Sequence, residues 1–477
     1  MRRLFVLLPL AGTLLAGCAV DTREASFDRV QENVADRGSF EVVWRASDGT
    51  ANGREAFEAA VEDGTLDAEE AVRIALLNNA DLQAELDRLG IASAALLRAS
   101  LLPNPVLDAS VRFADEGEII ELGIAQNVLQ LLLIPGRRAQ ASEALAMTEA
   151  ETAAAVLDLT AESRTAFRRY QAQQARVELY ENVVDATYLA ADMARRLRAA
   201  GNIIELDVLQ DEALYSDARL MLAEAQGEAS RRREALCALL GVWGPAADGW
   251  SVPPRLPAPG EFDVDAASLV PEVVASSLDL EAQRRQVNVI ARQAGIRSFE
   301  TLVPDLEVGV DAEREVDGAW SVGPAVGVGL PVFNVGQGVR AEYRARLSEA
   351  LHRYAGLAVR LRAETRSAYT TAATTAQTSR YLQEVLLPQR SEITQQTQLQ
   401  FNAMQLGVFR LLEAKRNEIE TAERYLSALE AHWAARIRLE TLRMGRMPQP
   451  RFGIETGGGM SSSSADMNNP GNQNGGH

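Results

Sequence analysis

Four short segments of the chain alternate between apolar and polar residues, with the two-residue period of a β-strand. They form two pairs, at about residues 106–128 and 305–331. In the first segment one face is apolar and consists of Leu107, Ala109, Val111 and Phe113. Stretches of about 9–11 residues with one apolar face match transmembrane strands, although a half-buried sheet in a soluble domain has the same pattern. Four strands are too few to close a barrel, so insertion in a membrane would require several chains to share one.

Each strand pair is followed by an exceptionally long helical pattern. The patterns cover residues 136–200 and 338–405, and a helix over the first would be roughly 95 Å long. Apolar side chains recur there at three- and four-residue steps among alanines. This spacing is typical of close helix-on-helix packing.

The long patterns are each interrupted once by a glycine. The interruptions are at Gly201 and Gly407, and the returning helices are predicted to end at about Leu240 and Met444. The sequence therefore predicts two long antiparallel helical hairpins, with a bend in the second at Pro388, because proline cannot continue the hydrogen-bond ladder of a helix.

The order helix, strand pair, long helix, turn and helix occurs twice along the chain. The segment ADLQA at residues 80–84 recurs loosely as LDLEA at residues 278–282. The predicted organisation is a lipoprotein signal peptide (1–17), a lipidated N-terminal segment (18–65), a first repeat (66–240, with long helices at about 136–240), a Gly/Pro-rich connector (241–265), a second repeat (266–446, with long helices at about 338–444) and a disordered Gly/Ser/Asn-rich tail (447–477).

The first 18 residues have the pattern of a lipoprotein export signal. Arg2 and Arg3 precede an apolar run that is too short for a spanning helix of about 20 residues. The run ends in LAGC at residues 15–18, which resembles a bacterial lipobox in which Cys18 is diacylated; an ordinary secretory signal is the alternative. In the sorting pattern that this resembles, an aspartate after the cysteine retains the protein at the inner membrane. Ala19 stands there instead and favours the outer membrane.

Composition excludes several classes of protein. The chain has a formal charge of −18, which makes a nucleic-acid partner unlikely because such proteins present a basic face. With 3 His and 2 Cys, a disulfide scaffold and most zinc or haem chemistry are excluded. Ser348 and His352 are one helical turn apart but lie in a long helical run, so we expect no catalytic residue, no metal and no cofactor beyond the lipid on Cys18. Cys237 is expected to be a buried, inert thiol.

Several motifs, in this order and spacing, resemble the TolC family of bacterial outer-membrane efflux ducts. They cover about residues 27–446 and comprise the lipobox, LDAEEA at 66–71, NNADL at 78–82, LLPNP at 101–105, LPVF at 330–333 with Gly336-Gln337, and LGVF at 406–409 with LLEA at 411–414.

The resemblance implies a mixed α/β, mostly helical fold in a homotrimer. Three chains would supply four strands each to a 12-stranded β-barrel, and the helices would form a tunnel across the periplasm. It further implies the outer-membrane channel of a tripartite efflux pump, with a periplasmic adaptor and an inner-membrane pump of the resistance–nodulation–division type as partners. The alternatives are a non-conducting coiled-coil envelope lipoprotein and the duct of a type I protein secretion system. The sequence does not identify the cargo, which could be a drug, a metal cation or a polypeptide.

The resemblance also indicates where the tunnel would narrow. The family carries acidic residues shortly after the tip glycine of the second repeat, and Glu413 stands six residues after Gly407. Asp207 stands six residues after Gly201 in the first repeat. Arg416 stands where the family often has a second acid, and an ion pair between Glu413 and Arg416, within one chain or between chains, is one substitute for the double acidic ring. Solvated charges at helix ends are the alternative interpretation.

Apolar residues around the two tip glycines are candidates for adaptor contact. The predicted contact residues are Gly201, Leu206, Leu209, Gly407, Leu411 and Leu412. Packing between neighbouring tips within a trimer would explain the same residues.

Overall fold

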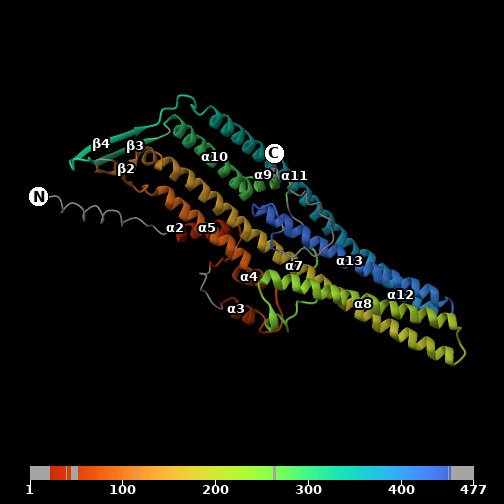
Figure 1. Cartoon of the computed structure of the whole chain (residues 1–477). Helices are drawn as coiled ribbons and strands as arrows, with labels where there is room; N and C mark the ends of the chain where they lie inside the picture. Colours follow the sequence, from red (N-terminus) through yellow and green to blue (C-terminus); the bar gives the residue numbers. More distant parts are fainter. Residues whose placement is uncertain are drawn as a thin grey trace, which may run out of the picture.

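The computed structural model describes residues 22–38, 40–44, 52–114, 117–260, 265–303, 305–449 and 451–452. The molecule is elongated, with a small β-sheet at one end and the turns of two helical hairpins at the other (Figure 1). The predicted signal peptide, Cys18 and the part of the predicted tail after Phe452 lie outside the described residues. Within the described part of the chain, each helix is too short or too polar to cross a lipid bilayer.

The predicted order of elements is present in both halves of the chain. The first half contains α2 (Thr22–Ala35), α3 (Asn52–Ala60), α4 (Ala68–Asn78), α5 (Ala80–Ser100), β1 (Val106–Ala114), β2 (Gly117–Asn127), α6 (Val128–Leu132), α7 (Ile134–Ala199) and α8 (Glu205–Leu240). A short 3-10 helix, η1 (Gly244–Ala247), lies in the connector. The second half contains α9 (Ala266–Ser276), α10 (Leu278–Leu302), β3 (Leu306–Arg314), β4 (Trp320–Val328), α11 (Gln337–Tyr381), α12 (Leu387–Asn402) and α13 (Val408–Arg443).

The four strands form one antiparallel sheet in the order β1-β2-β3-β4. Each repeat contributes one hairpin, and the pairing of β2 with β3 joins the two repeats. Within the chain, β1 and β4 are the edge strands. Pro324 lies in β4, a position that suits proline because an edge strand does not need every backbone N–H for its ladder.

The helices form a single layer that continues from the sheet, called the helical layer below. In the half next to the sheet, α7 packs against α5 and α10, and α10 packs against α11. In the half next to the turns, α7 packs against α8 and α13, and α13 packs against α12. The outer members of the helical layer are therefore α5 and α8 on one side and α11 and α12 on the other.

A glycine in the left-handed conformation ends α8 where that helix meets α5. Gly241 has φ 65°, and a Cβ at this position would lie 2.8 Å from the carbonyl oxygen of Asn78. Asn79 begins α5: its side chain accepts a hydrogen bond from Leu82 N and donates one to Leu239 O at 3.1 Å. The end of α8 is thus fixed to the start of α5, and only glycine fits the close approach.

The second repeat has the same junction between α13 and α10. Gly445 has φ 93° and its Cα faces the carbonyl of Ser276 so closely that a side chain could not be accommodated. Ser277 caps α10, and Leu278 N donates to Gly445 O at 2.8 Å. The duplication inferred from sequence is therefore visible at atomic detail in the two junctions.

The long helix of the second repeat is interrupted before Pro388. A π-helical turn, η2 (Leu382–Leu386), separates α11 from α12, and Pro388 lies in the first turn of α12. Proline offers no N–H to the preceding turn, and a π-turn is a common way to absorb such a disturbance. The long helix is therefore interrupted next to Pro388, as predicted, and the bend at this proline stays a prediction.

Candidate functional site

The sheet has one continuous apolar face. Cross-strand partners on this face include Leu107 with Ile124, Ile124 with Val310, and Val308 with Val326. Large apolar side chains on it are solvent-exposed in the isolated chain, for example Leu107 at 74% and Val322 at 69%. A soluble domain would cover such a surface, so this face must meet lipid or a partner.

The opposite face of the sheet is polar and acidic. Its charged residues are Asp108 and Arg112 in β1, Glu121 in β2, and Glu307, Asp311 and Glu313 in β3. Small residues in β4, among them Gly323 and Gly327, complete the face. The charged groups therefore comprise five carboxylates and one guanidinium.

Two local contacts order this polar face. Glu121 forms an ion pair with Arg112 and accepts a hydrogen bond from the Ser110 hydroxyl at 2.9 Å. Asp311 lies over Gly123, where an added Cβ would be 2.8 Å from its Oδ1. Gly123 thus leaves room for the Asp311 carboxylate at the surface of the sheet.

The turns at the far ends of the two hairpins have the same hydrogen-bond pattern. In the first, Gly201 N donates to Arg198 O and Asn202 N donates to Leu197 O, both at 2.9 Å. In the second, Met404 N donates to Phe401 O at 2.8 Å and Gln405 N donates to Gln400 O at 2.9 Å. Both are Schellman motifs, whose key residue adopts the left-handed conformation.

The left-handed residue of the second turn is Met404 (φ 59°), in the place that Gly201 (φ 78°) takes in the first. Gly407 has φ −76° and precedes α13, as Ile204 precedes α8. The correspondence predicted between Gly201 and Gly407 is therefore shifted by three residues. A methionine in this conformation carries strain, because its Cβ is too close to the following carbonyl oxygen.

The shift changes how the predicted constriction residues compare between repeats. With Gly201 matched to Met404, Asp207 matches Arg410 rather than Glu413. Within the chain, the Glu413 carboxylate lies 3.3 Å from the guanidinium of Arg410, three residues before it in α13, and forms no ion pair with Arg416 among the described contacts. A Glu413–Arg416 pair between neighbouring chains stays a prediction.

The first tip carries two carboxylates without a cationic neighbour among the described contacts. Asp207 lies in the first turn of α8, and Asp211 one turn later is 7% exposed. Burial raises the pKa of the Asp211 carboxyl, and the nearby negative charge of Asp207 raises it further. Sequence reasoning missed Asp211, although the i,i+4 spacing of two acids on one helix was a usable signal.

The apolar tip residues differ in exposure. Leu206 and Leu209 are exposed, whereas Leu411 and Leu412 are half-buried in their own hairpin. Two tip residues that were not predicted as contacts are more exposed than these leucines: Met404 is 95% exposed, and Phe409 at the start of α13 is 68% exposed.

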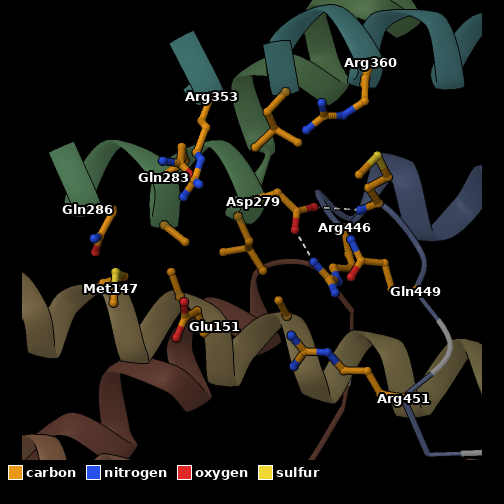
Figure 2. A pocket seen from close by; sticks show the side chains of 16 residues that line it. Met147, Glu151, Asp279, Gln283, Gln286, Arg353, Arg360, Arg446, Gln449 and Arg451 are labelled. Carbon is orange, nitrogen blue, oxygen red and sulfur yellow. Dashed lines mark hydrogen bonds and ion pairs between the residues drawn. The ribbon is translucent and has the colours of Figure 1, made fainter. Parts of the chain in front are cut away.

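A cavity of about 590 Å³ lies between α7, α10, α11 and the segment after α13 (Figure 2). Arg446 lies at its wall and donates to the two carboxylate oxygens of Asp158 in α7 at 2.8 and 2.7 Å. It also pairs with Asp279 at the start of α10, which accepts a hydrogen bond from Met447 N at 2.8 Å. This charge cluster joins the end of the second repeat to the middle of α7.

Two further predictions concern residues away from these surfaces. Cys237 is 3% exposed, and burial raises the pKa of its thiol to about 11, as expected for an inert thiol. Ser348 and His352 lie on a solvent-facing surface of α11 with no strand-to-helix turn nearby.

The comparisons with known proteins agree with this geometry, although the scan against family models found no match. The chain is 24% identical to the cobalt-zinc-cadmium resistance protein CzcC of Cupriavidus metallidurans over 80% of its length and 91% of that protein. It is 29% identical to the fusaric acid resistance protein FusA of Burkholderia cepacia, over 42% of the chain and 38% of FusA.

Solved outer-membrane channels share the fold over most of the chain. The Campylobacter jejuni CmeC outer membrane channel superposes with a TM-score of 0.70 at 13% identity, over 86% of this chain and 92% of CmeC. The chain therefore has the fold of these outer-membrane channels, with the two long helical hairpins and the two β-hairpins predicted from the sequence.

Proposed function

We propose that the protein is a lipid-anchored, homotrimeric duct that exports small cations. The observation that carries this is the sheet, with an exposed apolar face, an acidic face and two edge strands free to pair. Three copies would close a 12-stranded barrel whose apolar face meets lipid and whose acidic face lines the lumen, as in membrane barrels with an aqueous channel.

The acidic face supports a cationic cargo. Five carboxylates per chain, against Arg112 as the one guanidinium of that face, give fifteen carboxylates around the lumen of a trimer. Charge of one sign lining a channel concentrates counter-ions and repels ions of its own sign. The name of CzcC, a cobalt-zinc-cadmium resistance protein, agrees with this direction; export of an organic acid, as the name of FusA suggests, would work against the field.

The tips of the hairpins would bind a periplasmic adaptor that serves a pump of the resistance–nodulation–division type. The exposed apolar residues support this, with Leu206 and Leu209 on the first tip and Met404 and Phe409 on the second. Gly201 would shape the first turn, and Gly407 would start α13 at the second tip. Leu411 and Leu412 would hold the second tip together and meet the adaptor with their exposed parts.

The constriction of the tunnel would be set by charges at the same tips. Glu413 is partly neutralised by Arg410, so the unneutralised carboxylates of Asp207 and Asp211 would dominate the field. Arg416 would add a positive charge in the second repeat, opposing cation entry beside it. Removing Arg416 should therefore raise cation conductance, and removing Asp207 should lower it.

Cys18 would carry the lipid anchor. Its support is the lipobox at residues 15–18 and Ala19 after it. Cys18→Ser should abolish palmitate labelling, and labelling that persists in the variant would exclude this site.

Ion selectivity in planar bilayers tests the proposed cargo class. With purified protein under a KCl gradient, the reversal potential should show preference for K⁺. Asp108→Asn combined with Asp311→Asn should reduce it, whereas Glu55→Gln combined with Glu62→Gln, exposed and remote from the sheet, should not. Equal selectivity of wild type and the Asp108/Asp311 variant would show that this face does not line the conducting path.

A further inference from the structure

Four arginines at the sheet end of the helical layer have no partner within the described part of the chain. One lies in α5, one in α7 and two in α11, each within about two turns of the helix end next to the sheet. All four are exposed, and none forms an ion pair or a side-chain hydrogen bond among the described contacts. They are called the arginine collar below and are Arg98, Arg138, Arg340 and Arg344.

The carboxylates at the same level are already paired. Residues 94–100, 134–144, 296–302 and 337–344 of the four helices contain three acids. Their ion pairs are Glu143 with Arg285, Glu300 with Arg297, and Glu342 with Arg346. The collar therefore keeps its positive charges, although the chain as a whole has a formal charge of −18.

The collar arginines of α5 and α7 lie on the same face of the helical layer as α2. Eleven residues make three turns of a helix, so two residues at this spacing share a face. Arg138 stands eleven residues before Glu149, whose carboxylate accepts a hydrogen bond from Arg29 of α2 at 3.0 Å. Arg98 stands eleven residues after Asp87, which accepts a hydrogen bond from the segment that follows α2.

The two collar arginines of α11 lie on that face as well. Arg340 stands eighteen residues, or five turns, before Ala358, and Arg344 comes one turn after Arg340. Ala358 packs against the hydrophobic cluster that α11 forms with α9. α9 adjoins the end of the α2 segment, where the Arg37 guanidinium donates to the last carbonyl of α9 at 3.3 Å. The face shared by α2, α9 and the collar is called the anchor face below, because α2 starts four residues after Cys18.

Exposed apolar residues lie between the sheet and the collar. Leu330 and Val332 continue the two-residue step of the apolar face of β4 beyond its last residue, and they are 77% and 70% exposed. Phe333 is 94% exposed, and Leu102 and Leu302, which precede β1 and β3, are exposed as well. The apolar surface of the sheet thus continues to the helix ends that carry the collar. Apolar residues bordered by arginines are typical of the boundary between hydrocarbon and lipid headgroups.

We infer that the arginine collar binds the phosphate groups of anionic phospholipids in the leaflet that faces the helices. This inference rests on the proposed membrane-inserted duct and adds the lipid class that its rim would bind. A guanidinium group can form two parallel hydrogen bonds with a phosphate, and basic residues close to a bilayer are attracted to anionic lipids. A trimer would present twelve such groups, four from each chain.

The position of the collar fits the headgroup layer. The strands have 9 to 11 residues, enough to cross the hydrocarbon when tilted, so the helices would start among the headgroups. Side chains on a helix lean towards its N-terminus. Because α7 and α11 begin next to the sheet, their collar arginines lean towards the bilayer. The lipid on Cys18, which precedes α2 on the anchor face, would enter the same leaflet.

Lipid binding measured by native mass spectrometry tests the inference. The detergent-extracted full chain is titrated with phosphatidylglycerol or with phosphatidylcholine of the same acyl chains, in about 50 mM ammonium acetate. The collar variant is Arg98→Gln, Arg138→Gln, Arg340→Gln and Arg344→Gln. The control variant removes the same charge from exposed arginines that also lack a partner among the described contacts but are remote from the sheet: Arg73→Gln, Arg169→Gln, Arg255→Gln and Arg366→Gln.

Wild type and the control variant should bind phosphatidylglycerol at least about tenfold more tightly than phosphatidylcholine, and the collar variant should bind the two lipids alike. The conservative variant, Arg98→Lys, Arg138→Lys, Arg340→Lys and Arg344→Lys, should keep most of the preference because its charge is unchanged. Excess inorganic phosphate should not displace the lipid; displacement would identify a general phosphate site and overturn the inference.

If the collar variant loses its helical circular dichroism, the salt dependence of wild type decides. A preference for phosphatidylglycerol that largely disappears at about 500 mM ammonium acetate supports the inference, and an unchanged preference overturns it. A folded collar variant that keeps the lipid preference also overturns it.

Recording the same preparations in planar bilayers separates this inference from the proposed duct. Wild type that conducts ions but binds both lipids equally overturns the inference and leaves the duct intact. A collar variant with unchanged lipid preference and altered ion selectivity would place the arginines in the lumen. Wild type that inserts without conducting would instead overturn the duct.

Discussion

The guanidinium group of Arg446 is bound in a bidentate hydrogen bond to Asp158, although the two residues are 288 positions apart in the chain. Both are almost completely buried. Arg446 also pairs with Asp279, so a single side chain joins α7, α10 and the segment after α13. Burial raises the pKa of the Asp158 carboxyl, and the hydrogen bonds from Arg446 oppose that rise. Arg446 therefore stabilises the charged form of the buried Asp158 carboxyl.

Arg446→Met should destabilise the protein strongly. Removing one partner of a buried ion pair costs about 3–5 kcal/mol. Arg451, which lies 3.5 Å from the Asp158 carboxylate and is 35% exposed, would compensate the remaining charge only in part. The double variant Arg446→Met with Asp158→Leu should lose less, because the fully buried Asp158 carboxylate is removed together with its arginine, and only Asp279 at the cavity wall loses an ion pair. Denaturation followed by circular dichroism measures both, with Arg424→Met on the exposed side of α13 as control. Similar midpoints for Arg446→Met and Arg424→Met would show that the cluster contributes little.

The two helix junctions should be intolerant of any side chain. Gly241→Ala and Gly445→Ala each combine a left-handed backbone with a clash against a carbonyl of the neighbouring helix. Gly249 also has a positive φ of 83° but open space around it. Gly249→Ala should therefore lower the unfolding free energy only by the about 1–2 kcal/mol that a Cβ costs in the left-handed conformation. The two junction variants should lower it more, because their Cβ also clashes. Equal losses at all three positions would mean that the junctions can shift to make room.

The strain at Met404 predicts an unusual pair of effects. Met404→Gly should leave the fold intact and raise the unfolding free energy, by up to about 1 kcal/mol, because glycine adopts the left-handed conformation without a penalty. The same change should weaken binding of the adaptor, since it removes a side chain that is 95% exposed at the tip. Thermal denaturation and surface plasmon resonance with the purified adaptor measure the two quantities. Unchanged adaptor affinity would exclude Met404 from the contact.

His432 should make stability depend on pH. It is 1% exposed, and burial together with the nearby positive charges of Arg436 and Arg380 lowers its pKa. The unfolded chain then binds a proton more readily than the folded one, so the unfolding free energy falls as the pH drops below about 6.5. The slope cannot exceed about 1.4 kcal/mol per pH unit for one proton. His432→Gln should flatten this dependence, and a matching change at the exposed His352 should not; an unchanged profile in His432→Gln would assign the effect to other groups.

The regular elements of the fold could be predicted from sequence because local periodicity determines them. β1 to β4 fall within the predicted strand ranges, and α7 begins and ends within two residues of its predicted limits. The duplicated order was also readable, since each repeat carries its own strand pair, followed by a long helical pattern with one glycine interruption. These features depend on residues that are close together in the chain, so their spacing can be read directly from the sequence.

Contacts between distant segments could not be predicted in the same way. Nothing near Arg446 in sequence indicates Asp158 as its partner. Met404 was missed because methionine seldom adopts the left-handed conformation, so Gly407 was the natural choice for the turn. Glu413 had arginines three residues away in both directions, and spacing alone could not decide between Arg410 and Arg416.

Single-channel recording of the purified full-length protein in planar bilayers tests whether the assembled chain conducts ions. We expect native mass spectrometry to find a trimer and the same preparation to open stable, cation-preferring channels. Val308→Arg, on the apolar face of β3, should impair assembly, because an arginine facing lipid costs about 2–4 kcal/mol at the bilayer midplane. Folded trimeric protein that inserts into bilayers without conducting ions would show that the assembled chain is not a duct.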